Sequence, residues 1–189
     1  MKNSRDLALI AMFAAISFVF NVLIGQLPGL ITGLAGMAYV FTIVYSIIQS
    51  VAYLMYGGRR WRIFAQALLL SLLYFLFIPS WTLPVVMATI TNMFIVDLIF
   101  NSLHGKFKKD NRLFRWILAL QVYSWITHRF MMLAFLSLFV PMDAVLALFI
   151  PLTSVILPII IVEAVAGSFI GYKIYGGVEK ISVKNAHAN

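Results

Sequence analysis

Four ionisable side chains lie within long apolar stretches of the chain: Asp97, His128, Arg129 and Glu163. Each costs roughly 2.5–3.5 kcal/mol to place in hydrocarbon unless another group satisfies it. A buried guanidinium is best satisfied by a carboxylate or a phosphate, which it binds through two parallel hydrogen bonds. An intramembrane carboxylate can also carry protons. These residues therefore predict either anion binding or proton transfer in apolar surroundings.

Arg129 belongs to a polar and aromatic helix face. At 100° per residue, Gln121, Trp125 and His128 fall within about 60° of one another, and Arg129 flanks Trp125. Arg129 lies about 21 Å along a helix from Arg115. This face predicts a ligand site in which Arg129 binds a carboxylate or phosphate and Trp125 stacks on a ring. The alternative is that Arg129 extends towards the nearer polar surface, with His128 as a polar filler.

Glu163 shares a helix face with two small residues, Gly167 and Gly171, at steps of four. Small residues at this spacing predict the close approach of another helix. Two roles stay open for Glu163: a functional one, as a ligand contact or as the counter-ion that holds Arg129, or a purely structural buried pair with Arg129.

Three further residues complete the predicted set. We interpret Asp97, with Asn101 one turn later, as a structural residue or one that couples conformational changes. Asn92 lies on another face of the same stretch and is a candidate hydrogen-bond donor to a ligand. Trp81 lies in a short loop, and we expect it to anchor the chain at an interface, with a lid over the site as the alternative.

The composition identifies the surroundings of these residues as lipid. The 189 residues are 63% hydrophobic and 11% charged, whereas roughly a quarter of a soluble domain is charged. The mean hydropathy is +1.00. The N-terminal segment 1–6 precedes an apolar run without a credible cleavage site, so it predicts a retained first span rather than a signal peptide.

We therefore predict an all-α protein with a single transmembrane domain over residues 1–189. A span needs about 20 mostly apolar residues. Six stretches fit: Leu7–Ile24, Leu30–Tyr56, Ile63–Ile78, Leu83–Leu103, Leu113–Val140 and Leu152–Tyr175. The segment Pro141–Pro151 is too short to cross, and it is either an interfacial or re-entrant piece or an extension of the sixth span.

The positive charges predict the orientation. Thirteen of the fourteen Lys and Arg residues fall at the two ends of the chain or in alternate connections, Arg59–Arg62 and His104–Arg115, and the exception is Arg129. Because basic loops stay in the cytoplasm, both termini are expected there, in a multi-pass protein of the cell membrane. The same pattern accounts for the net charge of +8 through contacts with anionic lipid, and it argues against nucleic-acid binding.

Several kinds of chemistry have no sequence support. The chain contains no cysteine and no glycine-rich phosphate loop, and its three histidines are scattered. Ser124 lies one turn from His128, which alone is weak support for hydrolysis. We therefore expect no enzyme activity, no cofactor and no metal site.

The first span contains the small-residue pair Ala11 and Ala15 within the segment Arg5–Ile16. This opening, the six-span layout and the missing nucleotide motif resemble the substrate-binding S components of energy-coupling factor (ECF) importers. The resemblance implies that Ala11 and Ala15 face a transmembrane coupling subunit and that the loop Gln26–Gly29 occupies the position of a lid. It places the ligand pocket in the outer half, where Trp125, His128, Arg129 and Glu163 lie.

The resemblance also implies a function. The chain would bind a vitamin or its precursor, one with an anionic group, and work with the coupling subunit and two cytoplasmic ATPase subunits. The first alternative is a stand-alone secondary transporter in which Asp97 and Glu163 carry protons. A membrane enzyme or a scaffold is the remaining possibility.

Overall fold

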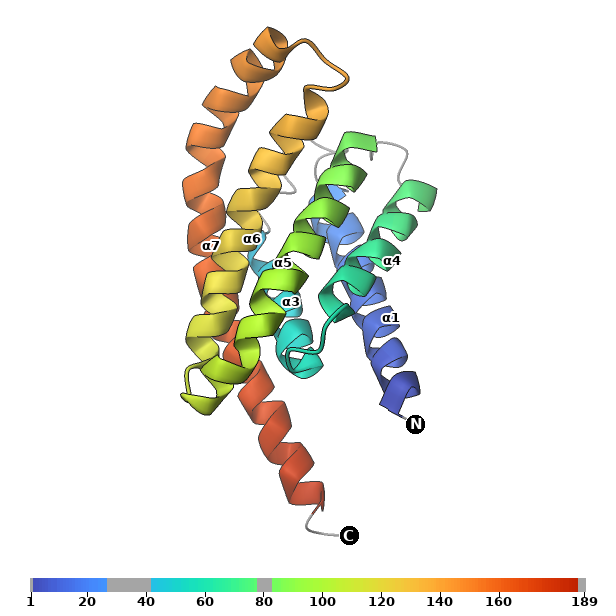
Figure 1. Cartoon of the computed structure of the whole chain (residues 1–189), viewed down its shortest axis with the longest axis vertical. Helices are drawn as coiled ribbons and strands as arrows, with labels where there is room; N and C mark the ends of the chain where they lie inside the picture. Colours follow the sequence, from blue (N-terminus) through green and yellow to red (C-terminus); the bar gives the residue numbers. More distant parts are fainter. Residues whose placement is uncertain (1, 27–41, 78–82, 187–189) are drawn as a thin grey trace.

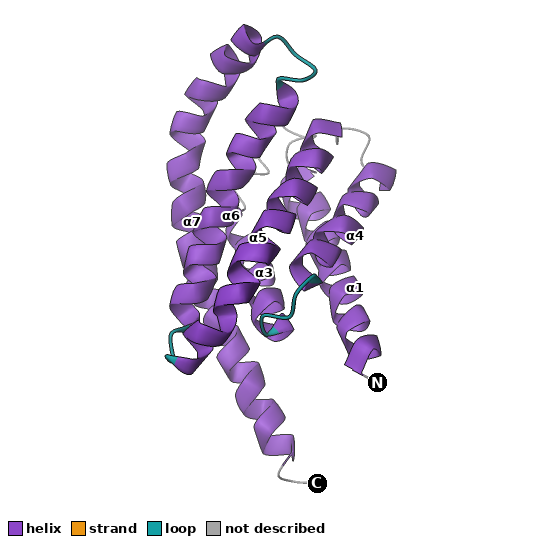
Figure 2. Ribbon diagram, viewed as in Figure 1, coloured by secondary structure: helices purple, strands orange, loops and turns teal. Residues whose placement is uncertain are grey.

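The computed structural model describes residues 2–26, 42–77 and 83–186, and this part of the chain is helical with short connections and no strand. Figures 1 and 2 show the helices side by side in a bundle. They are α1 (Lys2–Phe20), which continues as the π-helical turn η1 (Asn21–Gln26), α3 (Thr42–Tyr56), α4 (Arg62–Phe77), α5 (Leu83–Lys109), α6 (Leu113–Leu136) and α7 (Met142–Ala186).

Three of the described segments are long and apolar enough to cross a membrane: Ser4–Ile24, Leu83–Lys109 and Thr153–Glu179. The helices α3 and α4 are apolar but shorter in their described parts. The fold class predicted from the sequence, an all-α chain with apolar helices, is confirmed. The described parts of the predicted spans are helical except at residues 137–140, where the chain turns after α6 ends at Leu136.

The segment Pro141–Pro151 is part of α7. The helix begins at Met142 and contains Pro151 and Pro158 in its interior, so the extension of the last span is the alternative that the structure shows. With 45 residues, α7 is about 67 Å long, more than twice the roughly 30 Å of a bilayer core. It therefore projects beyond the other helices at both ends (Figure 1).

The basic connections gather at one end of the bundle. The first residues of α1, the last residues of α7 and the turns between α3 and α4 and between α5 and α6 all lie there (Figure 1). The connection between α6 and α7 lies at the opposite end. The structure thus brings Arg59, Arg60 and Arg62 to the same end as the Lys106–Arg115 segment.

The outside of the bundle is apolar and its interior holds polar groups. Large hydrophobic side chains such as Leu72 on α4 and Val162 on α7 are exposed, while Ser46, Asn92 and Gln121 are completely buried. A protein in water shows the reverse distribution, whereas lipid favours an apolar surface over internally satisfied polar groups.

The glycines of α7 pack against α3, as their spacing predicts. A Cβ atom on Gly167 would lie 2.5 Å from Ser46 Cβ, and one on Gly171 would lie 2.6 Å from Ser50 Cβ. The close approach expected at the two glycines is therefore confirmed, with α3 as the partner helix. Because the residue numbers of these two contacts increase in the same direction along both helices, α3 and α7 run parallel.

Candidate functional site

The polar face of α6 is directed at the serines of α3. Gln121 Nε2 donates to Ser50 Oγ at 3.2 Å, and Trp125 Nε1 donates to Ser46 Oγ at 3.1 Å. The two serines therefore contact α6 through their hydroxyl groups and the α7 glycines through their Cβ atoms. This arrangement gives Gln121 and Trp125 a role in joining helices, whether or not they also contact a ligand.

His128 and Asn92 connect α6 to α5. His128 Nε2 lies 3.2 Å from Thr89 Oγ1, and the Thr89 hydroxyl donates its proton to the carbonyl oxygen of Val85 at 2.9 Å. The histidine nitrogen is therefore the donor to Thr89. Asn92 Nδ2 donates to the backbone oxygen and to Oγ of Ser124, at 3.1 and 3.2 Å. Its Oδ1 accepts from the Thr127 hydroxyl, so both ends of this amide are used within the bundle.

Glu163 lies at the start of α3. One carboxylate oxygen accepts hydrogen bonds from the backbone N–H groups of Thr42 and Ile43 and from the Thr42 hydroxyl. Its Oε2 is buried with no hydrogen-bond partner among the residues that the structure describes. A carboxylate is favourable at a helix N-terminus, because the free N–H groups and the helix dipole are positive there.

Arg129 is 4% exposed and lies at the same level as Glu163. Gln121 meets Ser50 and Trp125 meets Ser46, so the next step of four along both helices brings Arg129 to the level of Thr42. The ion pairs between described residues both involve Asp6, with Arg59 and Arg62, and the expected pair of Arg129 with Glu163 is not one of them.

Asp97 has a structural role at the basic end of the bundle. Its carboxylate accepts the backbone N–H groups of Trp61 at 2.8 Å and Phe64 at 3.1 Å, and the side-chain amide of Asn101 at 2.7 Å. It thereby caps the N-terminus of α4 from the neighbouring helix α5. Trp61 has a φ of 70°, which a non-glycine residue adopts rarely, so these bonds hold a turn that the chain alone disfavours.

The remaining predicted residues lie on α1 and in the loops. Ala11 and Ala15 are exposed on the outside of α1, whereas Ala14 between them is completely buried against the bundle. Trp81 and the segment 27–29 of the expected lid lie outside the described residues.

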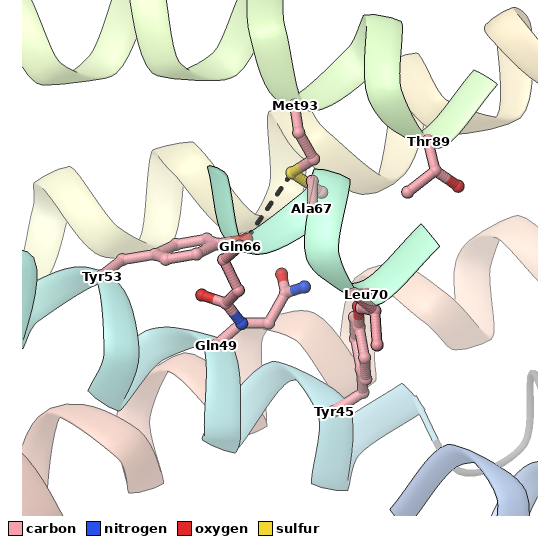
Figure 3. Close-up of a pocket in the computed structure, with 8 residues that line it drawn as sticks. All are labelled: Tyr45, Gln49, Tyr53, Gln66, Ala67, Leu70, Thr89 and Met93. Atoms are coloured by element: carbon pink, nitrogen blue, oxygen red, sulfur yellow. Dashed lines mark hydrogen bonds between the residues drawn. The ribbon is translucent and has the colours of Figure 1, made fainter. Parts of the chain in front are cut away.

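A small cavity lies between α3, α4 and α5, and the sequence analysis did not anticipate it. Figure 3 shows its lining: Tyr45, Gln49, Tyr53, Gln66, Ala67, Leu70, Thr89 and Met93. The enclosed space is about 10 Å³, which is room for about one water molecule. Gln49 on α3 and Gln66 on α4 contribute the two amides of this lining (Figure 3).

The predicted α6 residues form one wall behind this cavity. The ring of Trp125 lies 5.8 Å from that of Tyr45 and 6.4 Å from that of His128, and His128 binds Thr89. Since Tyr45 and Thr89 line the cavity, the site suggested by the sequence and the observed cavity are adjacent. The candidate site therefore comprises the cavity and the Trp125–His128 wall.

A signal for the missed residues was present in the sequence. Gln49 and Gln66 are amides in the middle of apolar stretches, and uncharged polar groups in such places need partners just as ionisable ones do. Tyr45, Gln49 and Tyr53 also recur at steps of four, which places them on one helix face.

The described residues contain no cluster of three or more His, Cys, Asp or Glu side chains that could hold a metal ion. Comparison of the chain with protein families, curated proteins and solved structures finds no match.

Proposed function

We propose that the chain is a multi-pass protein of the cell membrane with six spans and both termini in the cytoplasm. The apolar exterior supports a lipid environment, and three segments have the length and composition of membrane spans. The gathering of the basic connections with both helix ends at one end of the bundle supports the orientation (Figure 1).

Within this membrane protein, we propose a substrate-binding role: the S component of an ECF-type importer for a vitamin or a related micronutrient. The observation that carries the proposal is the cavity between α3, α4 and α5, in which polar and aromatic side chains converge inside an apolar bundle. Pockets of this composition are typical of small-molecule sites. Arg129, buried at the outer side of the site, is the group proposed to bind an anionic part of the substrate.

A ligand of vitamin size requires the bundle to open. Sites for such ligands measure about 300–1,000 Å³, far above the enclosed space of about 10 Å³. The helices α3 and α4 make sparse direct contact beyond the Tyr56–Gln66 hydrogen bond, so a widening between them costs little packing there while α4 keeps its contacts with α1 and α5. Binding is therefore expected to be coupled to a movement of α4 away from α3.

The exposed small residues of α1 support the proposed partner. Ala11 and Ala15 leave a shallow strip on the outside of the bundle, against which a helix of a coupling subunit can pack closely. The coupling subunit and two ATPase subunits would supply the energy for import, because this chain carries no phosphate-binding loop.

Proton-coupled transport by this chain alone is less well supported. Its two candidate carriers, Asp97 and Glu163, both cap helices, and Asp97 accepts hydrogen bonds from the backbone N–H groups of Trp61 and Phe64 and from the Asn101 amide. These contacts tie both carboxylates to the fold of the bundle.

Purification of the tagged chain from membranes of its own cells tests the proposal. We expect a transmembrane subunit and ATPase subunits to co-purify, and Ala15→Trp to lose them because its bulk blocks helix approach. Leu72→Trp, on the exposed face of α4, is the matched control and should retain them. Recovery of the chain alone, with uptake in liposomes driven by a proton gradient, would establish the secondary transporter instead.

A further inference from the structure

The cavity between α3, α4 and α5 is lined by uncharged side chains in the part of the chain that the structure describes. None of the eight described residues that line it is Asp, Glu, Lys, Arg or His. An ionised group placed there would lose its hydration without gaining a counter-charge, which costs several kcal/mol. The part of a ligand that enters this cavity must therefore be neutral.

Two hydrogen-bond donors in the cavity are not fully used. Gln66 is 2% exposed, and its Oε1 accepts the Tyr56 hydroxyl at 2.8 Å, which fixes the orientation of the amide. Its Nε2 is left buried without a hydrogen-bond partner in the described part of the chain. Tyr53 donates its hydroxyl proton to Met93 Sδ at 3.5 Å, and a thioether is a weak acceptor. Figure 3 shows both side chains at the cavity.

The amide of Asn92 gives a comparison within the same bundle. Asn92, also completely buried in this bundle, uses both its Nδ2 and its Oδ1 in contacts between α5 and α6. A buried donor without a partner costs about 1–3 kcal/mol, so an acceptor brought to Nε2 of Gln66 stabilises the protein. A ligand atom that accepts this hydrogen bond recovers the cost on binding.

We propose that this cavity binds a neutral hydrogen-bond acceptor of the substrate, a carbonyl oxygen or an unprotonated ring nitrogen, through Gln66 Nε2 and the Tyr53 hydroxyl. The space of about 10 Å³ fits one such polar atom, and the rest of the ligand occupies the room made when α4 moves from α3. The inference rests on the proposed function, because it takes the ligand to be the imported substrate. It identifies the inner end of that substrate as uncharged.

Thermal-shift measurements on the purified chain in detergent test this inference. The probes are riboflavin, biotin, nicotinamide and pyridoxine, which offer neutral acceptors, and inorganic phosphate and benzoate, which offer only anionic oxygens. We expect at least one of the first group to raise the melting temperature. Its affinity, measured by isothermal titration, should fall about tenfold or more in Gln66→Leu and severalfold in Tyr53→Phe.

Ser71→Ala is the matched control on the same helix. Ser71 is buried on α4 with a hydroxyl that has no partner among the described residues, and it does not line the cavity, so its loss should leave affinity unchanged. If Gln66→Leu does not fold, the affinity of Tyr53→Phe still tests the inference.

The outcomes separate this inference from the importer proposal. A probe that binds both folded cavity variants with wild-type affinity would overturn the inference and leave the importer standing. Binding of phosphate or benzoate, without binding of any neutral probe, would also overturn the inference and leave the importer proposal standing. Binding that depends on Gln66, in a chain that purifies without ATPase partners, would support the inference and contradict the importer. A folded chain that binds none of the neutral probes would contradict the inference.

Discussion

Asp97 and Gln66 are both buried polar residues, but their surroundings differ. Asp97, on α5, is 1% exposed and accepts three hydrogen bonds that hold the start of α4. Gln66, about one turn further along α4, keeps one buried donor without a partner in the described part of the chain. A buried polar group with hydrogen-bond partners contributes to the stability of the fold, whereas a buried donor without a partner lowers it. Asp97 therefore belongs to the framework of the fold, and we propose that Gln66 belongs to a ligand site.

The largest effect on the unfolding free energy is expected at the end of the bundle near Asp97. Asp97→Ala would leave two backbone N–H groups and the Asn101 amide without their acceptor and should destabilise the protein by about 3–5 kcal/mol. Asp97→Asn keeps one acceptor oxygen and should lose about 1–2 kcal/mol. Thermal or denaturant unfolding in detergent measures both. Wild-type stability in Asp97→Ala, accompanied by lost uptake, would instead assign Asp97 to conformational coupling.

The next effect concerns binding at the outer side of the site. Arg129→Met should weaken binding of an anionic substrate by about 2–5 kcal/mol, because a buried cation is removed. Arg129→Lys should recover part of the loss, since an ammonium lacks the planar fork of a guanidinium. Isothermal titration compares the two variants once a ligand is known. Unchanged affinity in folded Arg129→Met would make Arg129 a structural residue, like Asp97.

A smaller effect is expected where α3 and α7 touch. Gly167→Ala would place a Cβ 2.5 Å from Ser46 Cβ and 2.9 Å from the Ile43 carbonyl oxygen, so the helices must separate. We expect a loss of about 1–3 kcal/mol in unfolding free energy. Gly176→Ala is the control, because nothing lies within 4 Å of its added Cβ, and it should be neutral or stabilising by up to about 1 kcal/mol. Equal effects at both glycines would contradict the packing of α3 on α7.

The sequence predicted the helices better than the contacts between them. Hydropathy located the apolar stretches, and the spacing of Gly167 and Gly171 indicated a close approach, because both depend on neighbouring residues of one helix. The partner of those glycines, Ser46 and Ser50, depends on which helices lie side by side, and spacing within one helix does not determine that.

The sequence indicated only some of the residues around the cavity, for the same reason. Trp125 and His128 were identified from one helix face, and they do lie beside the cavity. Gln49 and Gln66 come from different helices and meet only in the folded bundle, so neither stood out alone. The cap that Asp97 provides depends on the turn at Trp61, whose unusual backbone conformation the sequence does not indicate.

The most direct test of the cavity as a ligand site is the stability of a double variant, Tyr56→Phe with Gln66→Leu, in the absence of any ligand. The two substitutions remove the Tyr56–Gln66 hydrogen bond together with the open donor, and such apolar replacement of both partners is nearly neutral or stabilising. The account predicts an unfolding free energy within about 1 kcal/mol of wild type, or higher, together with lost binding. A loss of several kcal/mol would contradict it, because Gln66 would then belong to the structural framework as Asp97 does.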